Sequence, residues 1–355
     1  MSHDIVVPGA VTRPSPATDG GPTPMTVSSA GEVLTSVADR GLHGEVVLVS
    51  PDGSVRVLYD LPAVHNPFLA KGSPELSPEP WARGGQIEGR WAVFGVGISY
   101  HHGGMIVGLV AVDLDSGIVE TVRAPLASSK LEYLSISYPV LLDGAVYWSE
   151  TSGDGSFDTF YFYDGPSTIY RLDLATKHRS TVAAGIHLRT RGPSPDGPAL
   201  INGAVNWVTS DGKQHWHGTP AKIPGFPAKI DLNMTVVQDG PNVAWTTASD
   251  PSNPEFQDTV FLGAGGETEP QIVYKMSPDE SYDSITLDAL SGPYLIFDKD
   301  PESTILLDIR TGATATVDSE TDVMAGGGVI VLDKYSGDRY HMALIRTDTL
   351  PELHC

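Results

Sequence analysis

Short apolar runs, rich in β-branched and aromatic residues, follow one another along almost the whole chain. Within many of these runs apolar and polar residues alternate, which is the two-residue period of a half-buried strand. Gly, Pro, Asn and Asp separate the runs, and these residues favour tight turns. No long stretch has the 3.6-residue spacing of an amphipathic helix. The pattern therefore predicts an all-β protein made of many short strands.

One type of β-hairpin recurs along the chain. The segments STIYRLDLATKHRSTV (Ser167–Val182) and STILLDIRTGATATV (Ser303–Val317) match each other. MIVGLVAVDLDSGIVETV (Met105–Val122) has the same form, and GEVVLVSPDGSVRVLYD (Gly44–Asp60) is a looser copy. Each consists of a strand, a turn such as Asp-Ser-Gly or Arg-Thr-Gly, and a second strand.

A second type of hairpin stands ahead of these copies. Its members carry a tight turn of the DG or NG kind, or the related SG or EG: Gly84–Val96, Tyr138–Glu150, Pro198–Ser210, Thr235–Thr247 and Leu287–Lys299. Two hairpins make a four-stranded unit that recurs every ~40–50 residues, the period expected of propeller blades. The units begin near Met25, Gly84, Leu134, Ser194, Ile230, Tyr282 and Thr321. We predict about seven blades, with six or eight as the alternatives because the fourth and fifth units are the least regular.

In these outer hairpins the chain resembles the β-propeller superfamily, in particular the quinoprotein-like, NHL-like and YncE-like propellers. The resemblance implies one propeller domain over residues 1–355, with an N-terminal segment at 1–24 and blades over 25–353. The segment HDIVVPGA (His3–Ala10) is predicted to close the ring by pairing, as an outer strand, with RYHMALIRTD (Arg339–Asp348). Closure would remove exposed sheet edges, which invite aggregation. Propellers of this kind include lyases, lactonases, dehydrogenases and binding platforms, so the fold does not select a function.

Charge and cysteine content exclude some classes of partner. The formal net charge is −22, from 22 basic and 44 acidic residues. Phosphate backbones and anionic membranes bind clustered Lys and Arg, so we expect neither nucleic acid nor membrane as a partner. The single cysteine is Cys355, so an intrachain disulfide is excluded. Because the sequence also contains no leader-like or membrane-spanning apolar run, we predict a cytoplasmic protein.

The predicted loops differ between the two faces of the disc. With the strands of a blade labelled A at the ring axis to D at the rim, B–C and D–A loops lie on one face, here called the mouth. The A–B and C–D turns on the other face are short, as in LDGA, INGA and IRTGA. The mouth loops are longer and rich in His and aromatic residues, and they include Ala38–Glu45, Pro62–Gly84, Ser99–Gly104, Pro125–Tyr133, Thr151–Ser167, Gly185–Gly197, Ser210–Lys222 and Ala248–Asp258. Functional residues gather on such loops, so the sequence predicts a site at the mouth.

Histidines and carboxylates are the predicted catalytic residues. A His facing a carboxylate can abstract and return a proton near neutral pH. The candidates are His101, His102, His215, His217 and Glu132, with Glu88 and Glu150 as further carboxylates. In the HWH sequence, His215 and His217 are alternate residues, so a strand would place both on one side. Such a pair could ligate a divalent metal with help from other loops, and loop histidines without a ligand role are the alternative.

Aromatic and arginine side chains are the predicted substrate contacts. Trp148, Trp207 and Trp245 recur at matching places in their blades, which indicates packing between blades rather than ligand binding. The side chains outside that repeat are the stacking candidates: Trp81, Tyr100, Tyr133, Phe157 and Trp216. Arg189 and Arg191 are alternate residues that could both face the channel and clamp a carboxylate or phosphate, with charge balance as the alternative.

From these features we predict an enzyme that handles a small molecule by acid–base chemistry at the mouth, as a lyase or cyclase of specialised metabolism. No organic cofactor is expected, and a divalent metal is left open. A non-catalytic binding or scaffold propeller and a metal-dependent, lactonase-like hydrolase are the two alternatives. The oligomeric state does not follow from the sequence.

Overall fold

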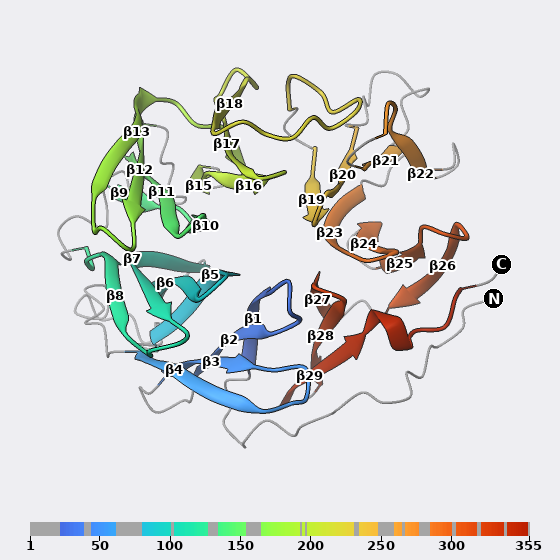
Figure 1. Cartoon of the computed structure of the whole chain (residues 1–355), viewed down its shortest axis with the longest axis horizontal. Coiled ribbons are helices and arrows are strands. Elements are labelled where there is room, and N and C mark those ends of the chain that lie inside the picture. The colour runs from blue at the N-terminus through green and yellow to red at the C-terminus, as the bar shows by residue number, and fades with distance from the viewer. Residues whose placement is uncertain are drawn as a thin grey trace.

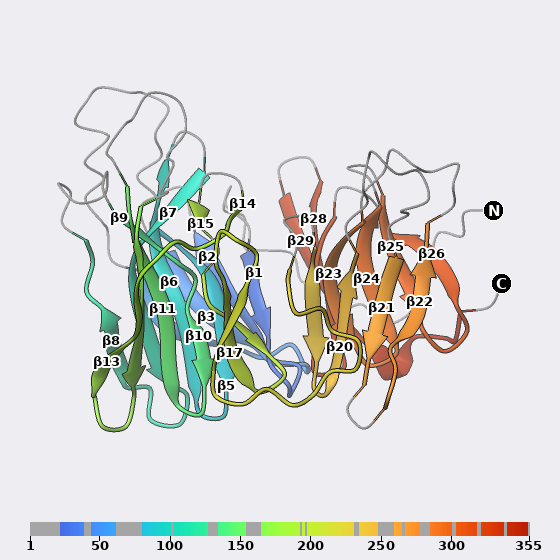
Figure 2. The ribbon, with the colours of Figure 1, turned by 90° about the horizontal axis from the view of Figure 1, so that it is seen from above.

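The computed structural model is a ring of seven antiparallel sheets around a central axis, and the predicted all-β propeller is confirmed (Figure 1). The structure describes residues 22–38, 44–61, 80–100, 103–126, 134–153, 165–191, 194–195, 197–230, 234–247, 259–264, 267–276, 285–299, 303–317, 321–336 and 339–353. Seen edge-on, the strands cross the thickness of the disc (Figure 2).

Blades 1 to 3 contain four or five strands each. Blade 1 consists of β1 (Pro22–Val27), β2 (Val33–Ala38), β3 (Gly44–Val49) and β4 (Val55–Leu61). Blade 2 consists of β5 (Pro80–Glu88), β6 (Trp91–Tyr100), β7 (Gly103–Asp113) and β8 (Val119–Arg123). Blade 3 consists of β9 (Leu134–Ile136), β10 (Val140–Leu142), β11 (Ala145–Ser152), β12 (Ser167–Asp173) and β13 (Arg179–Ile186).

Blades 4 to 7 follow in chain order. Blade 4 consists of β16 (Ala199–Ile201), β17 (Ala204–Val208) and β18 (Gln214–His217), preceded by the two-residue strands β14 (Thr190–Arg191) and β15 (Ser194–Pro195). Blade 5 consists of β19 (Val236–Asp239), β20 (Asn242–Thr246), β21 (Thr259–Gly263) and β22 (Gln271–Lys275). Blade 6 consists of β23 (Ile285–Ser291), β24 (Tyr294–Lys299), β25 (Thr304–Asp308) and β26 (Ala313–Val317). Blade 7 consists of β27 (Thr321–Gly326), β28 (Val329–Ser336) and β29 (Arg339–Arg346).

The A–B turns explain why the DG and NG hairpins form. Asp143 and Asn202 have φ of 50° and 48°, and the glycine after each also has positive φ. Two successive left-handed residues make the turn whose twist matches that of the flanking strands. Asp and Asn tolerate this conformation better than other residues with a side chain, and glycine adopts it without a steric cost.

The C–D turns of blades 2, 3 and 6 share an aspartate. Asp113, Asp173 and Asp308 end the third strands, and each accepts hydrogen bonds from backbone N–H groups of the turn that follows. Each carboxylate also pairs with an arginine: Arg90 with Asp113, Arg171 with Asp173, and Arg310 with Asp308. The turn N–H and the Thr176 hydroxyl lower the pKa of Asp173 to about 2, since they stabilise its charged form.

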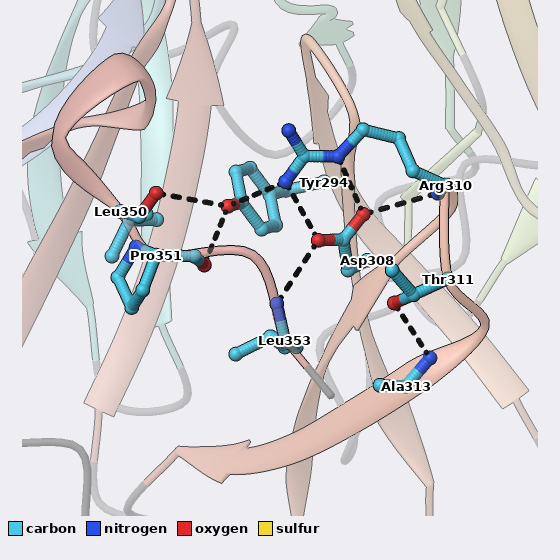
Figure 3. Close-up of polar contacts among 8 residues, drawn as sticks. All are labelled: Tyr294, Asp308, Arg310, Thr311, Ala313, Leu350, Pro351 and Leu353. Carbon is cyan, nitrogen blue, oxygen red and sulfur yellow. Dashed lines mark hydrogen bonds and ion pairs between the residues drawn. The ribbon is translucent and has the colours of Figure 1, made fainter. Parts of the chain in front are cut away.

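In blade 6 the same aspartate also holds the C-terminal segment (Figure 3). The N–H of Leu353 donates to Asp308 Oδ2 over 3.2 Å, and the Tyr294 hydroxyl donates to the carbonyl of Pro351 over 3.1 Å. Arg310 Nη2 donates to both Asp308 and Tyr294, so it joins the two anchors. Both Asp308 and Tyr294 are fully buried. The last described residues are therefore tied to blade 6 beside its A–B and C–D turns, on the face opposite the mouth.

Apolar clusters and single hydrogen bonds join neighbouring blades. Trp148, Trp207 and Trp245 are buried in such clusters, which confirms their predicted packing role. Side-chain oxygens reach across three junctions: Ser36 Oγ accepts from Ala82 N, Gln86 Oε1 from Leu141 N, and Gln238 Oε1 from Asn202 N. These contacts fix the inner strands around the axis.

The predicted closure of the ring concerns residues outside the described part of the chain. Within the described residues blade 7 has three strands, and β29 is its outermost. The closing strand at His3–Ala10 therefore stays a prediction. No helix among the described residues is long and apolar enough to span a bilayer.

Candidate functional site

A cavity of about 490 Å³ lies among the inner strands of the ring. Its polar lining comes from four blades: Thr23 from blade 1, Arg83 from blade 2, Tyr138 from blade 3, and Asp288, Asp298 and Thr304 from blade 6. The remaining lining residues are Pro24, Met25, Gly84, Val323 and Met324. We call this space the channel cavity. One cation, two carboxylates and a phenol therefore face a common volume.

Three of the inner strands carry a β-bulge at this cavity. The pairing register shifts between Pro24 and Thr26 in β1, between Arg83 and Gln86 in β5, and between Leu287 and Ala289 in β23. The bulged residues, which have no paired residue on the adjacent strand, include Met25, Gly84 and Asp288. All three line the cavity. Bulges re-aim side chains and are common beside active sites.

Tyr138 reaches the cavity because the inner strand of blade 3 is interrupted. β9 and β10 both pair with β11, and Ser137, Tyr138 and Pro139 stand between them. Ser137 holds the interruption in place, since its N–H donates to Ser149 O and its Oγ accepts from Ser149 N. The Tyr138 ring packs on Gly84, whose φ is +58°, and a Cβ at Gly84 would lie 2.0 Å from that ring. Tyr138 is 53% exposed, so its hydroxyl is accessible to a ligand.

Asp298 is oriented by its neighbour across the sheet. It lies near the end of β24, opposite Thr304 at the start of β25. The Thr304 hydroxyl donates to Asp298 Oδ1 over 2.6 Å. Thr304 is buried and Asp298 is half-buried, so this carboxylate has a fixed position at the cavity wall.

A second, smaller cavity of about 230 Å³ lies between blades 4 and 5. Arg189, one of the two predicted clamp residues, lines it and is 7% exposed. It lies apart from the lining of the channel cavity, although the sequence predicted that it faces the channel. Arg191 lies in β14, and the structure describes its backbone only.

His215 and His217 lie in a strand rather than in the predicted B–C loop. They belong to β18, the third strand of blade 4, and the B–C connection is the short turn from Thr209 to Lys213. His215 stacks on Trp207 with ring centroids 5.8 Å apart, and its Nε2 lies 3.3 Å from Thr209 Oγ1. The His217 ring lies 5.5 Å from that of Tyr147 in blade 3. Trp216 is half-buried in the same strand.

Several predicted residues fall outside what the structure describes. His101, His102, Glu132, Tyr133 and Phe157 lie outside the described residues. Trp81 and Tyr100 lie in β5 and β6, and only their backbones are described. Their catalytic and binding roles stay predictions.

The two further carboxylates lie away from the channel cavity. Glu150 Oε1 accepts hydrogen bonds from Arg123 Nε at 2.9 Å, Trp148 Nε1 at 3.2 Å and Arg179 Nη2 at 3.4 Å. Those bonds give Glu150 a structural role between blades 2 and 3. Glu88 ends β5 at the A–B turn, on the face opposite the mouth, and burial raises its pKa.

Arg83, Tyr138, Asp288 and Asp298 were not among the predicted site residues. The signal that marks Arg83 and Asp288 is a charged residue inside an inner strand, as in ARGGQIEG and ITLDALSG. Strand alternation alone does not reveal it, because a bulge changes which face the residue occupies.

Comparison with known proteins bears on the fold. No protein-family profile matches the chain, and no curated protein matches it in sequence. Among solved structures, oligogalacturonate lyase from Vibrio parahaemolyticus superposes with a TM-score of 0.54 at 10% identity, covering 99% of this chain and 100% of that one. An oligogalacturonate lyase in complex with manganese gives 0.50 at 11% identity, covering 98% and 100%. At these identities the likeness establishes a seven-bladed propeller fold that is also found in enzymes.

Proposed function

We propose that the chain is a lyase whose active site is the channel cavity, and that its substrate is a small molecule bearing a carboxylate. One observation carries the proposal: four residues from three blades face one volume of about 490 Å³. Arg83 and Asp288 come from bulged inner strands, Tyr138 from the split inner strand of blade 3, and Asp298 from the end of β24. That volume lies in the range of small-molecule sites. The fold shared with a lyase adds to it.

Arg83 supplies the binding interaction in this proposal. A guanidinium pairs with a carboxylate through two parallel hydrogen bonds, which fixes both the position and the orientation of the substrate. When a proton leaves the carbon beside that carboxylate, negative charge develops on the carboxylate oxygens. A preorganised cation at that place lowers the energy of the transition state more than that of the ground state.

The elimination then needs one base and one acid. The Asp288 carboxylate takes the proton from the carbon beside the substrate carboxylate, and those electrons form a carbon–carbon double bond. The bond from the next carbon to its oxygen substituent breaks, and the Tyr138 hydroxyl gives its proton to the departing oxygen. Asp298, held by Thr304, accepts a hydrogen bond from a substrate hydroxyl. His101, His102 and Glu132 are the predicted alternative acid and base, supplied by the mouth loops.

A divalent metal is plausible because one structural neighbour is a manganese complex. The described residues do not fit that ion. They contain no group of three or more His, Cys, Asp or Glu side chains able to hold a metal. The rings of His215 and His217, the predicted ligand pair, lie against those of Trp207 and Tyr147, and their ligand role stays a prediction. The steps above therefore use only side chains of the chain.

The test is an elimination assay on the purified protein. The substrates are oligogalacturonates and smaller carboxylates with a hydrogen on the α-carbon and an oxygen substituent on the β-carbon, each with and without Mn²⁺. Formation of a double bond conjugated to a carboxylate is followed by its ultraviolet absorbance. The variants are Arg83→Gln, Asp288→Asn and Tyr138→Phe, and Tyr170→Phe on the outer part of blade 3 is the matched control.

We expect turnover that falls by at least ~100-fold in Asp288→Asn and Tyr138→Phe, since general acid–base groups contribute about that much. Arg83→Gln should raise KM, and Tyr170→Phe should leave activity unchanged. Turnover that survives all three channel variants, or that disappears only in His101→Ala and His102→Ala, would move the site to the mouth loops. No turnover, together with a peptide bound at the channel, would identify the scaffold alternative.

A further inference from the structure

We propose a second ligand site, for a small carboxylate with an apolar body, in the cavity between blades 4 and 5. Its volume is about 230 Å³, and it lies apart from the channel cavity. The lining combines one buried cation, Arg189, with a wall of mostly apolar residues. The proposal does not rest on the lyase reaction.

Strand pairing determines which way Arg189 faces. Leu188 pairs with Thr209, and the N–H of Arg189 donates to the carbonyl of Val208 over 2.9 Å. Alternate residues of a strand face opposite sides, so Leu188 and Arg189 leave the sheet on different faces. Leu188 packs with Trp207 and Ile169 on the side toward blade 3. Arg189 therefore shares the other face with Val208, toward blade 5.

The opposite wall is apolar and comes from blade 5 and the segment before it. Ile230, Met234 and Val236 line the cavity there, and they pack with Val208. Ile201 and Ala199 add apolar surface from β16. A guanidinium binds a carboxylate through charge-assisted hydrogen bonds, and its five N–H donors allow a ligand in addition to a partner within the chain. A carboxylate with an apolar body therefore complements both the cation and the apolar wall.

The repeat explains why a cavity exists at this junction. In blade 3, Tyr147 stands just before the repeated Trp148 and packs toward blade 4, against Val205 and His217. Asn206 occupies the same place before Trp207 in blade 4. Asn206 is 1% exposed, and its Nδ2 donates to Gln214 Oε1 and His215 O. A small polar side chain thus replaces a large aromatic one, and space is left between blades 4 and 5.

The volume of the cavity between blades 4 and 5 limits the size of the ligand. A cavity of ~150 Å³ lined by apolar residues can hold one benzene molecule. A volume of about 230 Å³ therefore accommodates one ring, or a branched chain of similar size, together with a carboxylate. Benzoate and isobutyrate fit this description. Benzamide and isobutyramide have the same shapes without the charge, so they are matched controls for the role of Arg189.

The experiment measures binding by thermal unfolding and by titration calorimetry with these four compounds. We expect benzoate or isobutyrate to raise the melting temperature in a saturable manner, because a ligand that binds only the folded state stabilises it. The amides should not do so. Arg189→Gln should weaken carboxylate binding at least ~10-fold, as expected for loss of a charge-assisted pair. Val236→Phe, which fills the cavity from the opposite wall, should also abolish it.

Channel variants separate this site from the proposed active site. Arg83→Gln should keep the carboxylate-dependent rise in melting temperature, although it impairs the proposed lyase reaction. The circular dichroism spectrum of each variant verifies that it folds. The proposal is overturned if neither carboxylate binds the wild-type chain, if binding is unchanged in both Arg189→Gln and Val236→Phe, or if Arg83→Gln alone removes it.

Discussion

Replacement of Asp308 by Asn tests how the C-terminal segment is held. Asp308 is fully buried and accepts four hydrogen bonds: from Arg310 N at 3.0 Å, Arg310 Nε at 2.9 Å, Arg310 Nη2 at 2.7 Å and Leu353 N at 3.2 Å. Asn has one acceptor oxygen where Asp has two. The new amide NH₂ group would therefore face N–H donors at the place where one of the two carboxylate oxygens accepts hydrogen bonds.

The size of the effect follows from these bonds. Hydrogen bonds to charged groups contribute ~1.5–3 kcal/mol each, and two of the four would be lost. The Arg310 side chain is 47% exposed, so solvent screening reduces its share. We expect Asp308→Asn to lower the free energy of unfolding by about 2–3 kcal/mol. At about 2.1 cal/mol/K per residue over 355 residues, that corresponds to a fall of ~3–4 °C in melting temperature.

The pH dependence gives a second measure of the same group. Hydrogen bonds from Arg310 lower the pKa of Asp308, so its contribution to stability is present above the pKa of the unfolded chain and is lost as the pH falls through the folded value. Stability of the wild type should therefore decrease below about pH 4. Asp308→Asn should show a weaker decrease over that range.

The assay combines thermal unfolding with hydrogen exchange at residues 347–353. Asp173→Asn is the matched control, since Asp173 precedes the corresponding turn in blade 3 and bonds Thr176 and Arg171, but does not contact the C-terminal segment in the described structure. We expect faster exchange at 347–353 in Asp308→Asn and not in Asp173→Asn. If exchange there is equal in both variants and in the wild type, the carboxylate does not anchor the segment, and the reasoning is refuted.

Three further predictions concern the blades. Gly312→Ala should cost ~1–2 kcal/mol in unfolding free energy because φ is +71° there, while no atom lies within 4 Å of the new Cβ; denaturant titration checks it. Trp148→Ala should cost ~3–5 kcal/mol because the side chain is fully buried, whereas Ile272→Ala, at a residue 58% exposed, should change stability by less than ~0.5 kcal/mol in the same titration. Burial raises the pKa of Glu88, so its stabilising contribution is present below the unfolded pKa and is lost as the pH rises through the folded value. Glu88→Gln should therefore gain stability relative to the wild type as the pH rises from 4 to 7. A difference in unfolding free energy between the two proteins that stays constant over that range would contradict this reasoning.

The sequence predicts the blades well because the turn chemistry is local. Asp143-Gly144 and Asn202-Gly203 adopt the left-handed conformations that their residue types favour. The aspartates of the C–D turns bond the next backbone N–H groups, so each hairpin is specified by a few consecutive residues. Most of the predicted blade starts consequently lie within a few residues of the first strand of a blade.

The prediction that the HWH sequence (residues 215–217) lies in a B–C loop was wrong for a physical reason. β18 has an alternating pattern of half-buried and exposed residues, but its residues are polar or aromatic throughout. The hydrophobic period that predicts a strand is therefore missing, although the hydrogen-bonded ladder with β17 is complete. A strand of this composition and a loop give the same signal in sequence.

The channel residues depend on long-range pairing. Asp288 faces the cavity because β23 gains one residue relative to β24, and Tyr138 does so because the inner strand of blade 3 is split. The bulge in β23 leaves no turn residue in the local sequence, and the split in blade 3 is marked there only by Pro139. The arrangement around Arg83 depends in the same way on Gly84, whose missing Cβ makes room for the Tyr138 ring.

Both proposed sites lie where the blade repeat is broken. The repeat itself produces stability: it supplies the turns, the buried tryptophans and the aspartate–arginine pairs, and each copy serves the same role as the others. A residue that departs from its copies is not required by that shared framework. Sequences that specify a fold consistently tend to violate their own rules at functional positions. In this chain the charged Asp288, at a bulge position that Met25 occupies in β1, the split strand at Tyr138 and the small Asn206 are such departures, and each one borders a cavity.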